Sequence, residues 1–236
     1  MSAFEYSLSL KLGDLRAPEH ELFSRFMDFL HGSISDNTEA DLVSFMLGSR
    51  HSMLYGTHGI DARFDRQDRI KTAVERSRYR RDLEGDFDIV VVPPARPEES
   101  VSLQVKRIKV SATGAVTGRP NGLTGIAKGI EQANDDAALG FKFVYLVVFI
   151  VIDTRLKNAG RFTYEGPTPE MRWLIDDAIR PIGLDPRVGL MTCEEVQTMD
   201  QPAFTVGTGH IALKRTATAA PQSRMLTTWL DSLVAA

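Results

Sequence analysis

The sequence has a single cysteine, Cys193, among its 236 residues, so no disulfide can form within the chain. Its longest apolar run, Phe143–Ile152, has ten residues, whereas a membrane-spanning helix needs about 20. The first residues lack the basic start and the continuous apolar segment of a signal peptide. We therefore expect a cytoplasmic protein that does not enter a membrane.

Several catalytic and binding motifs are also missing. The sequence contains no Gly-x-x-x-x-Gly-Lys-Ser/Thr phosphate loop and no Gly-x-Ser-x-Gly nucleophile elbow. Its five histidines and one cysteine do not follow the spacing of zinc ligands. These absences exclude the function classes that depend on those motifs.

Positive and negative residues are present in nearly equal number, and the net charge of the chain is −3. The segment 63–81 departs from this balance, because it holds eight basic and three acidic residues and is therefore +5. Such a segment is either a solvated face or a surface for the phosphate backbone of a nucleic acid. The second interpretation makes Arg76, Arg78, Arg80 and Arg81 of this segment candidates for nucleic-acid contacts. Arg107 and Lys109 are further candidates, because they add positive charge in a stretch, 104–119, that holds no acidic residue.

Hydrophobic periodicity predicts an α/β (α+β) protein with a mixed central sheet. Apolar runs predict strands over 87–92, 101–110 and 143–152, and helical spacing predicts a helix over 123–139 that Gly140 ends. This order gives a hairpin followed by a strand–helix–strand crossover, which makes the sheet mixed. Weaker patterns predict strands over 4–11, 188–191 and 211–214, and helices over 18–30, 36–48, 169–179, 192–199 and 223–234.

Three polar side chains fall where the hairpin strands adjoin. Asp88 lies at the start of one strand, and Gln104 and Lys106 are the outward residues of the next. A hard cation such as Mg²⁺ or Mn²⁺ takes oxygen ligands, which Asp88, Gln104 and the backbone carbonyl of Val105 can supply. Lys106 can orient a water molecule or stabilise charge on a phosphoryl group. The pattern thus indicates phosphodiester hydrolysis.

At these residues the sequence resembles the PD-(D/E)xK nuclease superfamily, which has the restriction-endonuclease-like fold. The resemblance rests on segment 85–92, Gly-Asp-Phe-Asp-Ile-Val-Val-Val, and segment 103–106, Leu-Gln-Val-Lys, in which Gln104 replaces the second acidic residue. It implies that Asp88 and Gln104 bind metal and that Lys106 is catalytic. It also implies a glutamate from a preceding helix, for which Glu75 and Glu39 are the candidates, and a helix glutamine, for which Gln132 is the candidate.

The length of the chain predicts one domain over residues 1–236. The resemblance covers roughly residues 61–153 and implies a nuclease-like core at about 36–153, with elaborations at 1–35 and 154–236. We expect a Mg²⁺- or Mn²⁺-dependent deoxyribonuclease, compatible with restriction or antiviral defence and with a homodimer or a partner subunit. Because Gln104 removes a negative charge, the alternative is an inactive nuclease-fold subunit that binds nucleic acid or protein. A third interpretation is an unrelated α/β protein, in which Asp88 and Lys106 would lie far apart.

Overall fold

The structure is a computed structural model that describes residues 5–8, 69–93, 96–110, 120, 122–152, 169–201 and 204–235. The helices expected over 18–30 and 36–48, and with them Glu39, lie outside the described residues. No helix within the described ranges is long and apolar enough to cross a membrane.

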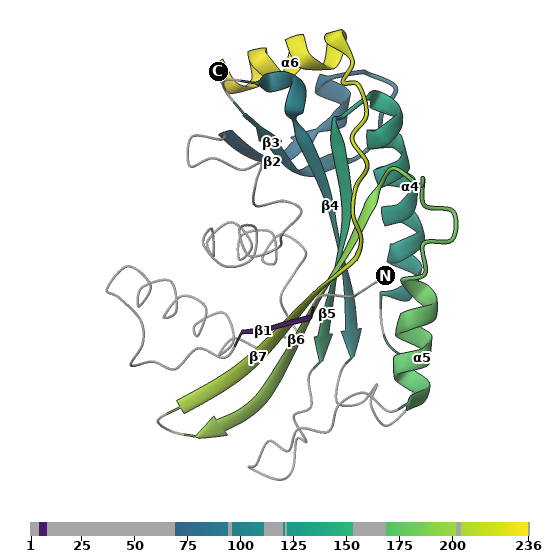
Figure 1. Cartoon of the computed structure of the whole chain (residues 1–236), viewed down its shortest axis with the longest axis vertical. Coiled ribbons are helices and arrows are strands. Elements are labelled where there is room, and N and C mark those ends of the chain that lie inside the picture. Colours follow the sequence, from purple (N-terminus) through teal and green to yellow (C-terminus); the bar gives the residue numbers. More distant parts are fainter. Residues whose placement is uncertain are drawn as a thin grey trace.

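One mixed sheet of seven strands, ordered β1-β7-β6-β5-β4-β3-β2, organises the described chain (Figure 1). β2 (Arg69–Glu75), β3 (Asp86–Val92) and β4 (Val101–Val110) form an antiparallel meander. β5 (Phe143–Ile152) pairs parallel with both β4 and β6 (Gly189–Gln201). β7 (Phe204–Arg215) pairs antiparallel with β6 and with the edge strand β1 (Glu5–Leu8).

The helices lie on and beside this sheet. α4 (Leu123–Leu139) connects β4 to β5, and α5 (Pro169–Ala178) connects β5 to β6. Both helices run along the same face of the sheet, and α6 (Arg224–Ala235) crosses its end beside β2 and β3 (Figure 1). Two short 3-10 helices, η4 (Arg76–Arg78) and η5 (Pro97–Glu99), adjoin the meander. The expected mixed sheet flanked by helices is therefore confirmed.

The central strands are buried on both faces, as their apolar sequences predict. Every residue of β5 from Phe143 to Ile150 is buried, and so are Ile89, Val90, Val91 and Val92 of β3. α4 packs its apolar side against this sheet through Ile126, Ala133 and Ala137. It ends at Gly140, which has a φ of 93°, in the left-handed region where glycine is favoured.

One sequence-based expectation for secondary structure is wrong, and one strand was not expected. The helix expected over 192–199 is part of β6, which hydrogen-bonds to β5 on one side and to β7 on the other. Pairing along both edges satisfies the backbone of β6, and such tertiary context overrides local helix propensity. β2 was not expected, because charged and polar residues at a sheet edge obscure the alternation of a strand.

Candidate functional site

Asp88 lies where β3 and β4 cease to pair. Their register ends at the pair Ile89 and Leu103, so Asp88 and Gln104 are the next residues on the two strands. The Asp88 Oδ2 atom accepts a hydrogen bond from the backbone N–H of Val105 at 2.7 Å. The carboxylate is therefore held by the edge of β4 at the point where the strands diverge.

Lys106 lies beside this carboxylate. Its Nζ atom is 3.5 Å from Asp88 Oδ2 and donates a hydrogen bond to the Val105 carbonyl oxygen at 2.9 Å. The side chain of Lys106 is only 8% exposed and that of Asp88 is 23% exposed. The expected proximity of Asp88 and Lys106 is therefore present, although Lys106 does not point outward as predicted.

Gln104 is also buried, contrary to the prediction that it is an outward residue, because α4 covers this face of β4. Its Nε2 atom donates a hydrogen bond to Asp136 Oδ2 at 2.9 Å. Within the described part of the chain, the Gln104 Oε1 atom has no hydrogen-bond partner. A buried acceptor of this kind is rare and is satisfied by a water molecule or a cation.

Asp136 belongs to a buried polar cluster, which we define as Arg76, Ser102, Gln104 and Asp136. Arg76 forms an ion pair with Asp136 Oδ1, and Ser102 donates to Asp136 Oδ2 at 2.6 Å. Burial raises the pKa of Asp136 to about 6, although Arg76, Ser102 and Gln104 lower it. The negative charge of Asp88 also raises this pKa, which places the two carboxylates within electrostatic reach of each other.

Arg76 therefore does not occupy a surface, as the prediction of a nucleic-acid contact requires. The residue is 1% exposed and also donates to the Gln132 backbone oxygen at 2.8 Å. Its guanidinium lies 5.2 Å from the centre of the Phe87 ring. Burial of its counter-ion, Asp136, explains why this arginine is internal.

The other basic candidates divide between two places. Arg78, Arg80 and Arg81 are exposed, and Arg80 pairs with Asp82 at 2.7 Å. Arg107 and Lys109 are half-buried and alternate with Lys106 along β4, so they point to the opposite face of the sheet. Of these five side chains, only Arg78, Arg80 and Arg81 are exposed, and they lie at the end of η4 and just after it.

Glu75 is exposed in β2, opposite Asp86, rather than in a helix as the resemblance implies. Gln132 lies on α4 and is half-buried, and its Nε2 atom is 3.1 Å from the place that a Cβ atom of Gly85 would occupy. Its own Oε1 atom is buried without a hydrogen-bond partner among the described residues. Gln132 therefore lies beside Gly85, which precedes β3, and its role in the site stays a prediction, whereas Glu75 lies in a strand.

The donor set suits a hard cation but carries little charge. Among the described residues, no group of three or more His, Cys, Asp or Glu side chains is arranged to hold a metal ion. The Asp88 carboxylate and the Val105 carbonyl both contact Lys106 Nζ. Gln104, the residue before Val105 on β4, offers Oε1 as a third oxygen donor. Mg²⁺ accepts one carboxylate with neutral oxygens and water, so these residues fit such an ion, and the unpartnered Gln104 oxygen is the observation in favour.

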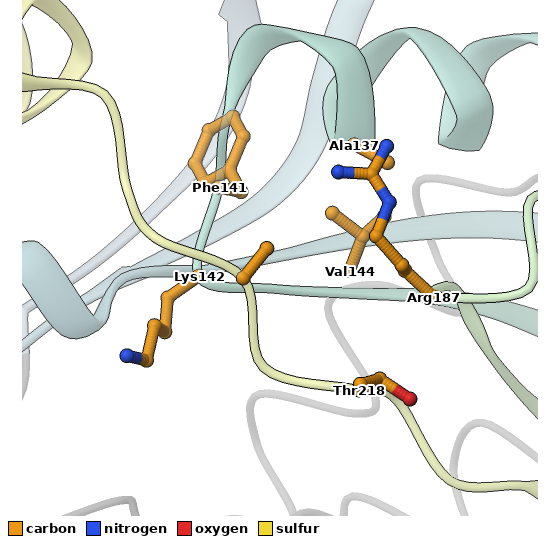
Figure 2. Close-up of a pocket in the computed structure, with 7 residues that line it drawn as sticks. Ala137, Phe141, Lys142, Val144, Arg187 and Thr218 are labelled. Atoms are coloured by element: carbon orange, nitrogen blue, oxygen red, sulfur yellow. The ribbon is translucent and has the colours of Figure 1, made fainter.

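Two hollows of the described structure lie away from these residues. One is lined by Ala137, Phe141, Val144, Arg187 and Thr218 (Figure 2) and measures about 10 Å³, enough for no more than one water molecule. An open hollow of about 500 Å³ lies at the start of α5, beside the exposed Trp173. Neither is lined by Asp88, Gln104 or Lys106, so the candidate site is defined by the contacts of these side chains where β3, β4 and α4 meet.

Asp136 is the residue that sequence reasoning missed. It falls on the face of α4 that also carries Ile126, Gly129 and Ala133, all of them buried. An ionisable residue at a core position of an amphipathic helix is a readable signal, because a buried charge requires a partner. Ser102 carried a similar signal, since it precedes Gln104 by two residues on the same face of β4.

Gly129 allows α4 to approach Lys106 closely. A Cβ atom at this position would lie 2.5 Å from Lys106 Cγ and 3.2 Å from Leu146 Cδ1. We therefore expect Gly129→Ala to lower the free energy of unfolding by about 1–3 kcal/mol, as overpacking does. Denaturant unfolding measures this change.

Gly125→Ala is the matched control, because nothing lies within 4 Å of a Cβ atom at that position, one turn earlier in α4. This variant should gain about 0.5–1 kcal/mol from helix propensity. If Gly129→Ala were stabilised to the same extent, the close packing of α4 on Lys106 would be wrong.

Comparison with known proteins gives no match: no family model, no curated protein and no solved structure matches this chain.

Proposed function

We propose that this protein is a metal-dependent nuclease with a restriction-endonuclease-like core that hydrolyses phosphodiester bonds of DNA. One observation carries the proposal: Asp88, Val105 and Lys106 form a contact network next to Gln104, whose buried oxygen has no partner among the described residues. The order β3, β4, α4, β5 supports it, since this is the order of elements that the resemblance requires.

The chemistry follows from the oxygen donors of Asp88, Gln104 and Val105. Asp88, Gln104 Oε1 and the Val105 carbonyl would hold Mg²⁺ or Mn²⁺, which when bound stabilises charge on the phosphoryl oxygens and acidifies a water molecule. Asp88 contributes the one negative charge among these donors. The strand edge orients its carboxylate through the Val105 N–H, so the position of the anchoring ligand does not depend on a flexible loop.

Lys106 supplies a positive charge at the same place. Its ammonium group contacts Asp88 and the Val105 carbonyl, so it lies next to any phosphoryl group bound there. It donates hydrogen bonds to the oxygens on which negative charge develops in the transition state. Its burial strengthens this interaction, because little water competes for the ammonium group.

Contacts with DNA come from the exposed arginines Arg78, Arg80 and Arg81. Arginines bind the phosphate backbone without regard to sequence, and such binding weakens steeply as the salt concentration rises. DNA binding by this protein should therefore depend on salt.

The site residues are tested by incubating supercoiled and linear DNA with the protein in Mg²⁺, in Mn²⁺ and in EDTA. We expect cleavage with either metal and none in EDTA. Lys106→Ala should lower the rate by about 100-fold or more, because it removes a charge-stabilising donor. Lys128→Ala, which changes an exposed lysine of α4, should cleave like the wild type.

Cleavage that persists in Lys106→Ala would contradict the assignment of the site.

A second candidate function is an inactive nuclease-fold subunit that binds nucleic acid. The observation in its favour is that Lys106 already contacts Asp88 and the Val105 carbonyl, two of the three donors, as a cation would. Salt-dependent DNA binding without cleavage in any metal would select this alternative.

A further inference from the structure

Gln104 is held in one orientation by Asp136. An ionised carboxylate only accepts hydrogen bonds, and an amide donates through nitrogen and accepts through oxygen. The contact between Gln104 Nε2 and Asp136 Oδ2 at 2.9 Å therefore turns Oε1 away from Asp136. The amide oxygen is left as the acceptor that Gln104 offers to the rest of the site.

Asp136 is itself held from two further sides. Arg76 pairs with its Oδ1 atom, and Ser102 donates to its Oδ2 atom at 2.6 Å. The carboxylate is 0% exposed, so bulk solvent does not reach these contacts. The orientation of Gln104 thus depends on Asp136 of α4. Asp136 is itself held by Ser102 of β4 and by Arg76, the residue that follows β2.

The same contact accounts for an amide at position 104. A glutamate there would place a second carboxylate against Asp136 in the protein interior, where two like charges are strongly unfavourable. As the site stands, Arg76 and Lys106 balance Asp88 and Asp136. Of the pair Gln104 and Asp136, only Asp136 is charged. The negative charge therefore lies on α4 rather than on β4.

We infer that Asp136 is a positioning residue for metal binding: it directs the Gln104 amide oxygen toward the cation held with Asp88 and Val105. The inference rests on the proposed function. It assigns to Asp136 a role that the sequence motif does not contain, because Asp136 acts only through Gln104.

The test exchanges the carboxylate and the amide. The variants are Gln104→Glu, Asp136→Asn and the double variant that carries both. Each is measured by Mn²⁺ titration calorimetry without DNA and by thermal unfolding in EDTA. Asp135→Asn is the matched control, since this neighbouring carboxylate is 60% exposed and 3.6 Å from Arg76.

Each single variant should unfold roughly 6–20 °C below the wild type, because Asp136→Asn leaves Arg76 without its buried counter-ion and Gln104→Glu adds an unpaired carboxylate beside Asp136. The double variant should recover most of this loss, since the pair again holds one carboxylate and one amide. Asp136→Asn should bind Mn²⁺ about 10- to 100-fold more weakly, as outer-shell changes do. The double variant should bind Mn²⁺ at least as tightly as the wild type, because the carboxylate is now on the strand.

Unchanged Mn²⁺ affinity in folded Asp136→Asn would overturn the inference alone. Absence of Mn²⁺ binding by the wild type would overturn the metal site of the proposed function and the inference with it. If Asp136→Asn does not fold, the double variant decides, since the inference requires that it fold and bind Mn²⁺. Failure of the double variant to do either would overturn it.

Discussion

Replacing Arg76 by methionine should lower the free energy of unfolding by about 3–5 kcal/mol, the usual cost of removing one partner of a buried ion pair. Asp136 would keep a charge at a position that is 0% exposed, with Ser102 and Gln104 as its remaining donors among the described residues. Equilibrium denaturation with urea at pH 7.5 measures this loss. Arg78→Met, which changes an exposed arginine two residues away, is the matched control and should change stability little.

The double variant Arg76→Met and Asp136→Leu should recover much of the loss, because apolar residues of similar volume often replace a buried ion pair at little cost. A loss no larger in Arg76→Met than in Arg78→Met would contradict the burial of this ion pair.

The effect of Arg76→Met should also depend on pH. Burial raises the pKa of Asp136 from 3.8 to about 6, so its contribution to stability is complete below pH 3.8 and is lost as the pH rises through about 6. Arg76 lowers this pKa, and its removal must raise it further. The variant should therefore match the wild type more closely at pH 5, where a neutral Asp136 needs no counter-ion, than at pH 7.5.

Asp88→Asn should lower metal-dependent DNA cleavage by more than about 100-fold, since it removes the one charged donor of the proposed site. The amide oxygen of an asparagine can still accept from the Val105 N–H, so the junction of β3 and β4 should persist. Cleavage of supercoiled DNA in Mg²⁺ and in Mn²⁺ measures the rate. Thermal unfolding of the same samples shows that the variant is folded.

Asp86→Asn is the control for this change, because Asp86 lies two residues earlier on β3 and is exposed. It should cleave at the wild-type rate. Equal rates in Asp88→Asn and Asp86→Asn, with the wild type active, would remove Asp88 from the proposed site.

The sequence predicted the strands at the centre of the sheet better than those farther out. β3, β4, α4 and β5 follow the expected ranges closely, because a long apolar run or a clear helical period defines each of them. β2 at the edge and β6 beyond the crossover do not, because their residues carry mixed local signals. Their strand structure comes from the neighbours with which they pair.

The candidate site, too, could be predicted from the sequence only in part. The hairpin of β3 and β4 brings Asp88 next to Val105 and Lys106, and this proximity follows from two adjacent strands and the alternation of side chains. The burial of Gln104 and Lys106 does not follow, since a polar residue in a strand is ordinarily taken to face solvent. It requires α4 above them and a glycine at position 129.

The sequence by itself determined the central strands, the crossover helix and the meeting of Asp88 with Lys106, because these depend on periodicity and on neighbours in the chain. Only the tertiary structure decided that Arg76 is internal and that Asp136 orients Gln104. These contacts join residues from the end of β2, from β4 and from α4, separated by up to 60 positions. They form because a buried charge must find its partner wherever the packing of helix on sheet places one.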